Sequence, residues 1–272
     1  HPTPLMGGVT LQGAVAPVIL AIAIFGVSAD WARHLIVWSA ALVTMTLVGL
    51  ADDRHTLSAR DRLLVSFLVF GSAAIIDPLF NVRMLGFEHP EFEFGLGTGW
   101  LAVVFTTVCC VGLVNAVNMA DGKNGLVIGL CLGWLALLAS RAPAPMIPAL
   151  AALAGSLTVL LLFNLRGRLF LGDGGAYGIA AGVGLMAIAI YNSPGAHAGR
   201  AISAEEVMLL FSVPVLDSFR LTFLRWRRGQ SPMTADREHL HHYLDSWLGW
   251  PAGLIVYLAA ALAPSALQLL AL

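Results

Sequence analysis

The sequence predicts an all-α membrane protein, a bundle of about nine transmembrane helices that forms one domain over residues 1–272. Hydrophobic residues make up 58% of the chain, charged residues make up 11%, and the mean hydropathy is +0.82. A soluble domain carries about twice that charged fraction. Apolar runs long enough to cross a bilayer recur along the chain, and the polar segments between them are short. Lipid must therefore solvate much of the protein.

The apolar runs are assigned to membrane spans in chain order, since each approaches the length of about 17–25 residues that a spanning helix needs. Pro17, Pro148 and Pro214 lie inside or near three of the runs, which membrane helices tolerate where neighbouring groups satisfy the freed backbone. The polar segment 81–99 contains alternating Phe and Glu, and predicts either a short hairpin or an interfacial segment. The spans are expected near 9–28, 33–50, 62–77, 99–117, 124–141, 145–163, 175–192, 206–224 and 250–271.

With nine spans, the connecting segments alternate between the two sides of the membrane. Eleven of the 15 Lys and Arg residues lie on or beside one side, and the other four lie towards the opposite side. The positive-inside bias predicts that the basic side is cytoplasmic. The chain starts at His1 rather than Met, so we expect an N-terminal helix to be missing. The segments on the basic side are 1–8, 51–61, 118–123, 164–174 and 225–249.

These basic-side segments also hold side chains that are unusual in so apolar a chain. Several carboxylates and an Asn are hard oxygen ligands of the kind that suit Mg²⁺ or Mn²⁺. Clustered Arg and His suit a phosphate or diphosphate, and acids that hold a metal among cations are typical of phosphoryl transfer. Because the site lies at the lipid boundary, we expect one soluble substrate and one lipid phosphate. The residues expected to converge are Asp52, Asp53, Asn118, Asp121, Asp173, His239, His241 and His242.

Four motifs between the hydrophobic spans carry a family resemblance. In order they are DDRHTL, NAVNMADGKNGL, FLGDGGA and DREHLHH, and PTPLMGG precedes them near the start of the chain. This ordered set resembles the polyprenyl-phosphate N-acetylhexosamine-1-phosphate transferases, also called glycosyltransferase family 4. The family moves a sugar-1-phosphate from a UDP-sugar to a polyprenyl phosphate, releases UMP and needs Mg²⁺. The expected cofactor of this chain is therefore Mg²⁺, and the oxygen ligands would also suit Mn²⁺. The HLHH element resembles the histidine motif of the branch of the family that uses UDP-N-acetylglucosamine or related sugars.

The resemblance implies a role for each matching residue. Asp173 matches the principal metal-binding Asp, and Asn118 matches a second metal or diphosphate contact. Asp52 and Asp53 match the paired acids, of which Asp52 is expected to deprotonate or orient the lipid phosphate, and Phe170 matches an aromatic that stacks on uracil. The other expected catalytic residues are Asp121, His239, His241 and His242. The other expected substrate-binding residues are Lys123, Asn124, Asn164 and Arg237.

The resemblance further implies an enzyme of the bacterial inner membrane whose site faces the cytoplasm. Its substrates would be a UDP-sugar and undecaprenyl or another polyprenyl phosphate, with no nucleic acid as partner, and a homodimer is left open. The reaction would begin the synthesis of a lipid-linked cell-surface glycan such as lipopolysaccharide, another polysaccharide or a cell-wall polymer.

Alternative interpretations remain open from the residues alone. The Asp52–Asp53 pair could be a solvated helix cap, Phe170 an ordinary interfacial aromatic, and Gly7 and Gly8 a site of close helix packing. At the level of the whole chain, the same chemistry could serve the phospho-MurNAc-pentapeptide transferase of peptidoglycan synthesis. A secondary transporter is a second alternative, although its polar groups would be expected near the bilayer midplane, on broken helices in related halves.

Overall fold

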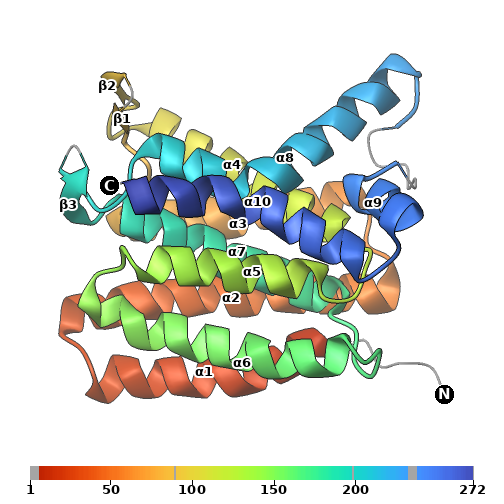
Figure 1. Cartoon of the computed structure of the whole chain (residues 1–272). Helices are drawn as coiled ribbons and strands as arrows, with labels where there is room; N and C mark the ends of the chain where they lie inside the picture. The colour runs from red at the N-terminus through yellow and green to blue at the C-terminus, as the bar shows by residue number, and fades with distance from the viewer. Residues whose placement is uncertain (1–5, 89, 198, 232–237, 272) are drawn as a thin grey trace.

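The computed structural model describes residues 6–88, 90–197, 199–231 and 238–271, which form a bundle of helices with a few short strands (Figure 1). Nine of the described helices match the nine expected spans, and this confirms the predicted all-α membrane bundle. A tenth, short helix lies where the sequence predicts a loop. The helices are α1 (Gly7–Phe25), α2 (Ala29–His55), α3 (Ala59–Ile76), α4 (Trp100–Ala120), α5 (Leu126–Ala139), α6 (Ile147–Asn164), α7 (Gly172–Tyr191), α8 (Ala204–Arg227), α9 (Leu240–Leu248) and α10 (Ala252–Ala271).

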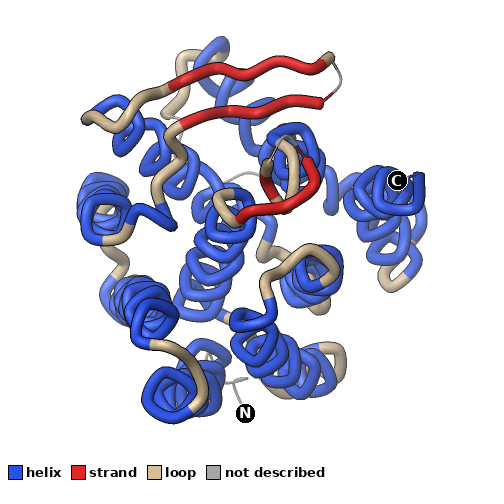
Figure 2. The backbone as a smooth tube through the Cα atoms, turned by 90° about the vertical axis from the view of Figure 1, so that its left-hand side faces the viewer, coloured by secondary structure: helices blue, strands red, loops and turns tan. Residues whose placement is uncertain are grey.

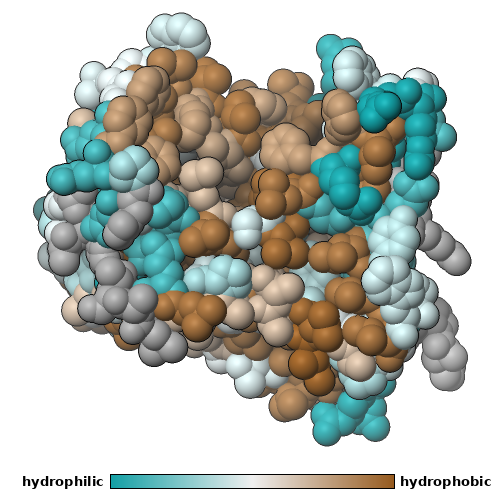
Figure 3. Space-filling view, turned by 45° about the horizontal axis from the view of Figure 1, so that its top comes forward, coloured by the Kyte–Doolittle hydropathy of each residue, from teal (hydrophilic) through white to brown (hydrophobic). Residues whose placement is uncertain are grey.

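Most of the described helices are suited to a bilayer. Seven are long and apolar enough to cross one, namely α1, α2, α4, α6, α7, α8 and α10. Helix α5 is apolar but has only 14 residues, and α3 carries Arg60, Asp61 and Arg62 in its first turn. In a space-filling view, an apolar band separates two hydrophilic ends of the molecule (Figure 3). An exposed apolar band of this kind is what a membrane-spanning bundle presents to lipid.

The strands lie together at one end of the bundle, opposite α9 and the start of α1 (Figures 1 and 2). β1 (Met84–Glu88) and β2 (Glu91–Gly95) pair antiparallel, so the hairpin predicted for segment 81–99 is confirmed. Tyr191, at the end of α7, accepts the N–H of Gly86 at 2.7 Å and donates to the carbonyl of Met84 at 2.8 Å. We call this end the hairpin end and the other the site end. The remaining short elements are β3 (Pro194–His197) and two 3₁₀ turns, Pro78–Phe80 and Ala144–Met146.

Helix α7 forms the centre of the bundle (Figure 2). All its residues from Gly174 to Tyr191 are buried. A Cβ atom on Gly49 of α2 would lie 2.2 Å from the carbonyl oxygen of Asp173, and one on Gly8 of α1 would lie 2.7 Å from the carbonyl carbon of Gly174. Small residues let membrane helices approach this closely. The interpretation of Gly8 as a close-packing residue is therefore confirmed.

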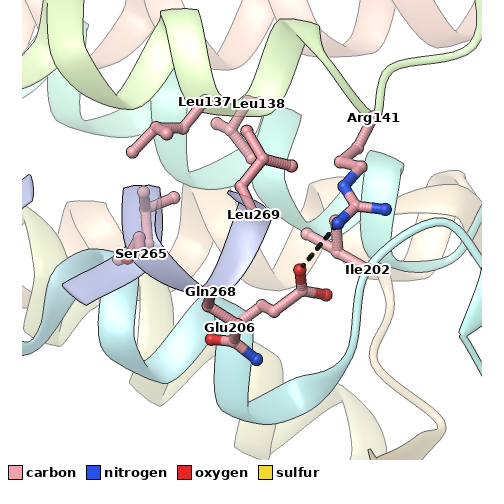
Figure 4. A pocket seen from close by; sticks show the side chains of 9 residues that line it. Leu137, Leu138, Arg141, Ile202, Glu206, Ser265, Gln268 and Leu269 are labelled. Atoms are coloured by element: carbon pink, nitrogen blue, oxygen red, sulfur yellow. Dashed lines mark hydrogen bonds and ion pairs between the residues drawn. The ribbon is translucent and has the colours of Figure 1, made fainter. Parts of the chain in front are cut away.

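A small pocket at the hairpin end lies between α5, α8 and α10 (Figure 4). Arg141 forms an ion pair there with Glu206 at 3.4 Å, and the side chains of Ser265 and Gln268 line the same space. Glu206 also belongs to a capping box with Ser203 at the start of α8. These contacts tie the start of α8 to the end of α5, far along the bundle from the predicted site residues.

Candidate active site

Two helices extend further towards the site than the sequence predicts. Helix α2 continues to His55 rather than stopping near residue 50, so Asp52 and Asp53 lie in its last turn and not in a loop. Helix α7 begins at Gly172 rather than near 175, so Asp173 lies in its first turn. The apolar runs end at the charged residues, whereas the hydrogen-bonded helical turns include them. Both helices therefore hold their acids in fixed directions.

Asp53 caps the N-terminus of α7 from the neighbouring helix. Its carboxylate accepts the N–H groups of Asp173 at 2.9 Å and of Gly174 at 3.1 Å. These are two of the N–H groups that have no partner within a helix, and the negative charge is favourable at the positive end of the helix dipole. Gly172 has a φ of 69°, and a Cβ atom there would lie 2.8 Å from Oδ2 of Asp53. Asp53 therefore caps a neighbouring helix, which differs from the solvated cap that was the alternative interpretation.

Asp52 points to a different set of partners and is only 7% exposed. It accepts the N–H of Leu57 at 2.8 Å, a guanidinium N–H of Arg62 at 2.9 Å and the hydroxyl of Tyr177 at 3.1 Å. Arg62 also donates to the Tyr177 hydroxyl at 3.2 Å, which closes a three-membered network. Neither Arg62 nor Tyr177 is among the site residues that the sequence predicts. The available signal was spacing, because Tyr177 follows Asp173 by four residues and shares its face of α7.

The carboxylate of Asp173 is held by a neutral amide. Asn118 of α4 donates from Nδ2 to Oδ1 of Asp173 at 2.7 Å, and Asp173 also interacts electrostatically with Asp52 and Asp53. Asp121 follows at the C-terminus of α4, where burial and then the negative charges of Asp173 and Asp53 raise its pKa to about 7. Four carboxylates from α2, α4 and α7 therefore belong to one cluster. Asp52 and Asp173 lie on the same face of the bundle, as predicted.

The loop after α4 is anchored both to α9 and to the segment that joins α9 and α10. Lys123 pairs with Asp245 of α9, and its Nζ lies 5.9 Å from the ring centroid of Trp250 in that segment. The Trp250 indole donates to the carbonyl oxygen of Asn124 at 3.0 Å. The structure therefore brings Lys123 and Asn124 to the site end, where their described contacts hold the loop in place.

Asn164 holds the same loop from the other side. Its Oδ1 accepts the N–H of Gly125 at 2.6 Å, and its Nδ2 donates to the carbonyl oxygen of Leu169 at 3.0 Å. Gly125 has a φ of 85°, a left-handed conformation that glycine adopts without strain. Asn164 thus joins the connection after α4 to the one before α7, and its described role is to position them.

The three histidines of the HLHH element meet at the start of α9. The rings of His239 and His241 stack with centroids 5.5 Å apart and planes 9° apart, and those of His241 and His242 lie 4.2 Å apart. His241 is 1% exposed, and neither of its ring nitrogens has a hydrogen-bond partner within the described residues. Burial, followed by the positive charges of the other two histidines, lowers the pKa of His241 to about 4.

The histidines pack directly on the loop after α4. A Cβ atom on Gly122 would lie only 2.4 Å from Nε2 of His241, so a larger residue at that position would have to displace the His241 ring. The predicted convergence of the HLHH element with Asp121 is therefore confirmed. Arg237, which we expected to bind diphosphate beside these histidines, lies outside the described residues.

Phe170 lies in the connection before α7. Its carbonyl oxygen accepts the N–H of Gly7 at 3.1 Å, which fixes the backbone, while the residue as a whole is 38% exposed. An exposed ring at this place is compatible with stacking on a base and with an interfacial position, so both interpretations stay open.

The donor set of this cluster suits a hard divalent cation. Within residues 6–88, 90–197, 199–231 and 238–271, no three His, Cys, Asp or Glu side chains converge closely enough to hold a metal ion by themselves. Mg²⁺ ordinarily takes only one or two protein carboxylates and completes its shell with water and substrate phosphate. Asp173 and the amide oxygen of Asn118 supply oxygen ligands of that kind, and the neighbouring carboxylates add negative charge. The residues present therefore fit a Mg²⁺ ion that shares its ligands with a phosphate substrate.

An apolar helical bundle with an acidic, histidine-flanked cluster at the ends of its helices defines a class, the integral membrane enzymes that act at the bilayer surface. Within this class the chain belongs to glycosyl transferase family 4, whose family model matches residues 35–191. The matched region contains the acids of α2, α4 and α7, and the family prediction is confirmed.

Similar proteins in several bacteria carry the name of one transferase. The chain is similar to the undecaprenyl-phosphate alpha-N-acetylglucosaminyl 1-phosphate transferase of Yersinia pestis, with 28% identity over 95% of this chain and 70% of that protein. The protein of the same name from Escherichia coli K12 is 26% identical over 96% of this chain and 71% of its own length. A probable undecaprenyl-phosphate N-acetylglucosaminyl 1-phosphate transferase of Bacillus subtilis is 28% identical, over 89% of this chain and 65% of that protein.

Proposed function

We propose that this protein transfers N-acetylglucosamine-1-phosphate from UDP-N-acetylglucosamine to undecaprenyl phosphate at the cytoplasmic face of a bacterial inner membrane, and releases UMP. The observation that carries the proposal is the carboxylate cluster, which α2, α4 and α7 hold at the membrane boundary between Arg62 and the histidines of α9. The names of the similar proteins support the choice of sugar and lipid.

The chemistry is a phosphoryl-type displacement. An oxygen of the lipid phosphate bonds to the β-phosphorus of the UDP-sugar, the bond from that phosphorus to the bridging oxygen breaks, and UMP leaves with the bridging oxygen. Asp52 orients Arg62, whose guanidinium pairs with the lipid phosphate and reduces repulsion between the two anions. The histidines of α9 bind the diphosphate, and Phe170 contacts the uracil. Asp53 keeps α7 in place, so that Asp173 stays next to Asn118.

Mg²⁺ would be held by Asp173 and Asn118 and would offset the negative charge of the diphosphate as the bond to UMP breaks. Mn²⁺ also prefers oxygen ligands and is the alternative ion. The supporting observation is the excess of carboxylates at this end of the bundle, where Asp52 has Arg62 as its cationic partner while Asp173 accepts from a neutral amide.

A groove along α8 suits the lipid chain. It has a volume of about 640 Å³, lies between α4, α7 and α8, and is lined almost entirely by apolar side chains. Helix α8 slants away from the bundle beyond this region (Figure 1). Met208, Leu216 and Phe219 are exposed along α8, so the groove is open on its lipid side. An isoprenoid chain buried there would place its phosphate towards the site end.

The test is UMP release by the purified protein in lipid nanodiscs with undecaprenyl phosphate, Mg²⁺ and a panel of UDP-sugars. We expect turnover with UDP-N-acetylglucosamine and none with UDP-MurNAc-pentapeptide. Turnover with the pentapeptide substrate alone would move the protein to the peptidoglycan branch. Ion-dependent uptake into vesicles without UMP would instead indicate a transporter.

The variant Asp173→Asn tests the centre of the site. It keeps the shape of the side chain and removes the charge, so we expect it to lose most of its turnover and to require far more Mg²⁺. The measurement is UMP release as a function of Mg²⁺ concentration, alongside binding of UDP-N-acetylglucosamine. Ordinary turnover of Asp173→Asn at ordinary Mg²⁺ would contradict the assignment of the metal ligand.

A further inference from the structure

Asp217 of α8 lies in the interior of a membrane-spanning helix, where a carboxylate is costly to bury unless it is paired. Its side chain is 9% exposed. The carboxylate reaches the segment just before α9: it accepts the N–H of Leu240, and Oδ2 lies 3.0 Å from Nδ1 of His239. It also accepts two guanidinium N–H groups of Arg220, at 3.2 and 2.8 Å.

Arg220 completes a clamp around His239. The same guanidinium donates to the carbonyl oxygen of Glu238 at 2.5 Å. Asp217 and Arg220 therefore hold the backbone on both sides of His239, through Glu238 before it and Leu240 after it. His239 is the N-cap residue of α9, yet its own side chain makes no capping hydrogen bond. The carboxylate of Asp217 on α8 supplies the cap instead, because it accepts the N–H of Leu240 in the first turn of α9.

The contact with Nδ1 also decides which ring nitrogen carries the proton. A carboxylate can only accept hydrogen bonds, and Asp217 already accepts from an arginine and a backbone amide. Nδ1 of His239 must therefore be the donor, which leaves Nε2 as the nitrogen that can meet a ligand. Carboxylate partners fix the tautomer and direction of metal-binding histidines in the same way.

We propose that Asp217 is a positioning residue that fixes His239 as the Nδ1–H tautomer and fastens the start of α9 to α8. The effect extends to His241, because the His239 ring stacks on it and His241 packs on Gly122 of the loop after α4. Asp217 thus sets the position of the histidines relative to the carboxylate cluster. The consequence for catalysis rests on the proposed function, in which Nε2 of His239 contacts the diphosphate.

The tautomer can be measured without activity. The full chain, labelled with ¹⁵N-histidine and reconstituted in bilayers, is studied by solid-state NMR at alkaline pH, where an ordinary imidazole is neutral. His239→Gln identifies the His239 signals. We expect His239 to show a protonated Nδ1, and Asp217→Asn to convert it to the Nε2–H form or to a mixture, because the Asn amide can donate to Nδ1. A wild-type protein with His239 in the Nε2–H form would overturn the proposal.

Kinetics then separate positioning from general stability. Asp217→Asn should lower kcat/KM for UDP-N-acetylglucosamine by roughly 10–100-fold, as loss of a partner behind a ligating histidine typically does. The matched control is Glu206→Gln, which removes a carboxylate from the same helix at the hairpin end and should leave both the tautomer and kcat/KM unchanged. A changed tautomer with wild-type kcat/KM, or an equal kinetic loss in Glu206→Gln, would overturn the positioning role. If the wild-type protein releases no UMP, the proposed function fails, while the NMR result still decides the tautomer.

Discussion

At the residue scale, the four carboxylates of the cluster share a chemical type but differ in surroundings. Asp52 faces a guanidinium and a phenol, Asp53 faces two backbone N–H groups, and Asp173 faces an amide. Burial, followed by the negative charges of Asp173 and Asp53, raises the pKa of Asp121 to about 7. The cluster is therefore suited to a cation that arrives with the substrate, since Asp52 has a cationic side chain as its partner whereas the partners of Asp53 and Asp173 are neutral.

The pH dependence of stability should reveal Asp121. In the unfolded chain this group ionises near an ordinary pKa of about 4, whereas in the folded protein it ionises near 7. Between these values the folded state binds more protons, so the contribution of Asp121 to stability falls as pH rises through this window. The Tm of Asp121→Asn minus the Tm of the wild type should therefore increase from pH 5 to pH 8, by roughly 2–8 °C for a chain of this size. The same difference in Tm between variant and wild type at both pH values would contradict a raised pKa of Asp121.

His241 provides a control of opposite sign. Its folded pKa of about 4 lies below the ordinary value, so its contribution is present near neutral pH and is lost as pH falls from about 6.5 to 4. His241→Gln should therefore gain in Tm relative to wild type at low pH and not at pH 8. Because each comparison is a difference between variant and wild type, the contribution of the other group cancels.

At the element scale, α7 depends on its neighbours for both its start and its position. Asp53 caps its first turn, and glycines on α1 and α2 let the three helices lie in contact. In lipid there is little hydrophobic force between helices, so close packing and interhelical hydrogen bonds stabilise them instead. The same contacts position Asp173, because its backbone packs against Gly49 and its N–H donates to the carboxylate of Asp53.

Gly49→Ala tests this packing. Its Cβ would lie 2.2 Å from the carbonyl oxygen of Asp173, so α2 and α7 must separate, and we expect a loss of about 1–3 kcal/mol in stability together with lower turnover. The matched control is Gly13→Ala in α1, where the new Cβ meets nothing within 4 Å. That variant should be neutral or gain about 0.5–1 kcal/mol, because alanine is the better helix former. Thermal unfolding in detergent and UMP release measure both, and similar losses in the two variants would contradict the close contact.

At the scale of the whole molecule, polar groups gather at two ends of an apolar band (Figure 3). The end with the carboxylates also carries most of the arginines, which predicts that it faces the cytoplasm. The hairpin end, with exposed β2, would then face the opposite compartment.

Cysteine labelling tests this orientation. Arg168 is exposed at the site end and Glu91 is exposed on β2. In a chain whose Cys109, Cys110 and Cys131 are replaced by alanine, a membrane-impermeant maleimide should label Glu91→Cys in intact spheroplasts. Arg168→Cys should be labelled only after the membrane is permeabilised. The reverse pattern would place the carboxylates on the outer face and contradict a cytoplasmic UDP-sugar.

The spans and the grouping of the motifs at one end could be predicted because both follow from local composition. The length of an apolar run does not depend on the rest of the chain. Because successive connecting segments alternate between the two sides of the membrane, the number of spans then assigns Asp52, Asn118, Asp173 and His241 to one side. The sequence predicts the end of α2 too early and the start of α7 too late, because the apolar runs exclude the charged residues Asp52 and Asp173 while the helical turns include them. The short helix α9 was missed because a nine-residue polar segment has no span-length signal.

By itself, then, the sequence determined a helical membrane protein with its acids and histidines at one basic end, since hydrophobicity and charge are properties of each segment alone. The tertiary structure decided which of these groups are partners. Asp53 with α7, Tyr177 with Asp52, and Asp217 with His239 are pairs from different helices, up to 125 residues apart in the chain. The contacts of α7 depend on how α1 and α2 pack against its glycines, and the contact of Asp217 depends on how α8 lies against the start of α9. No periodicity within one helix encodes such packing.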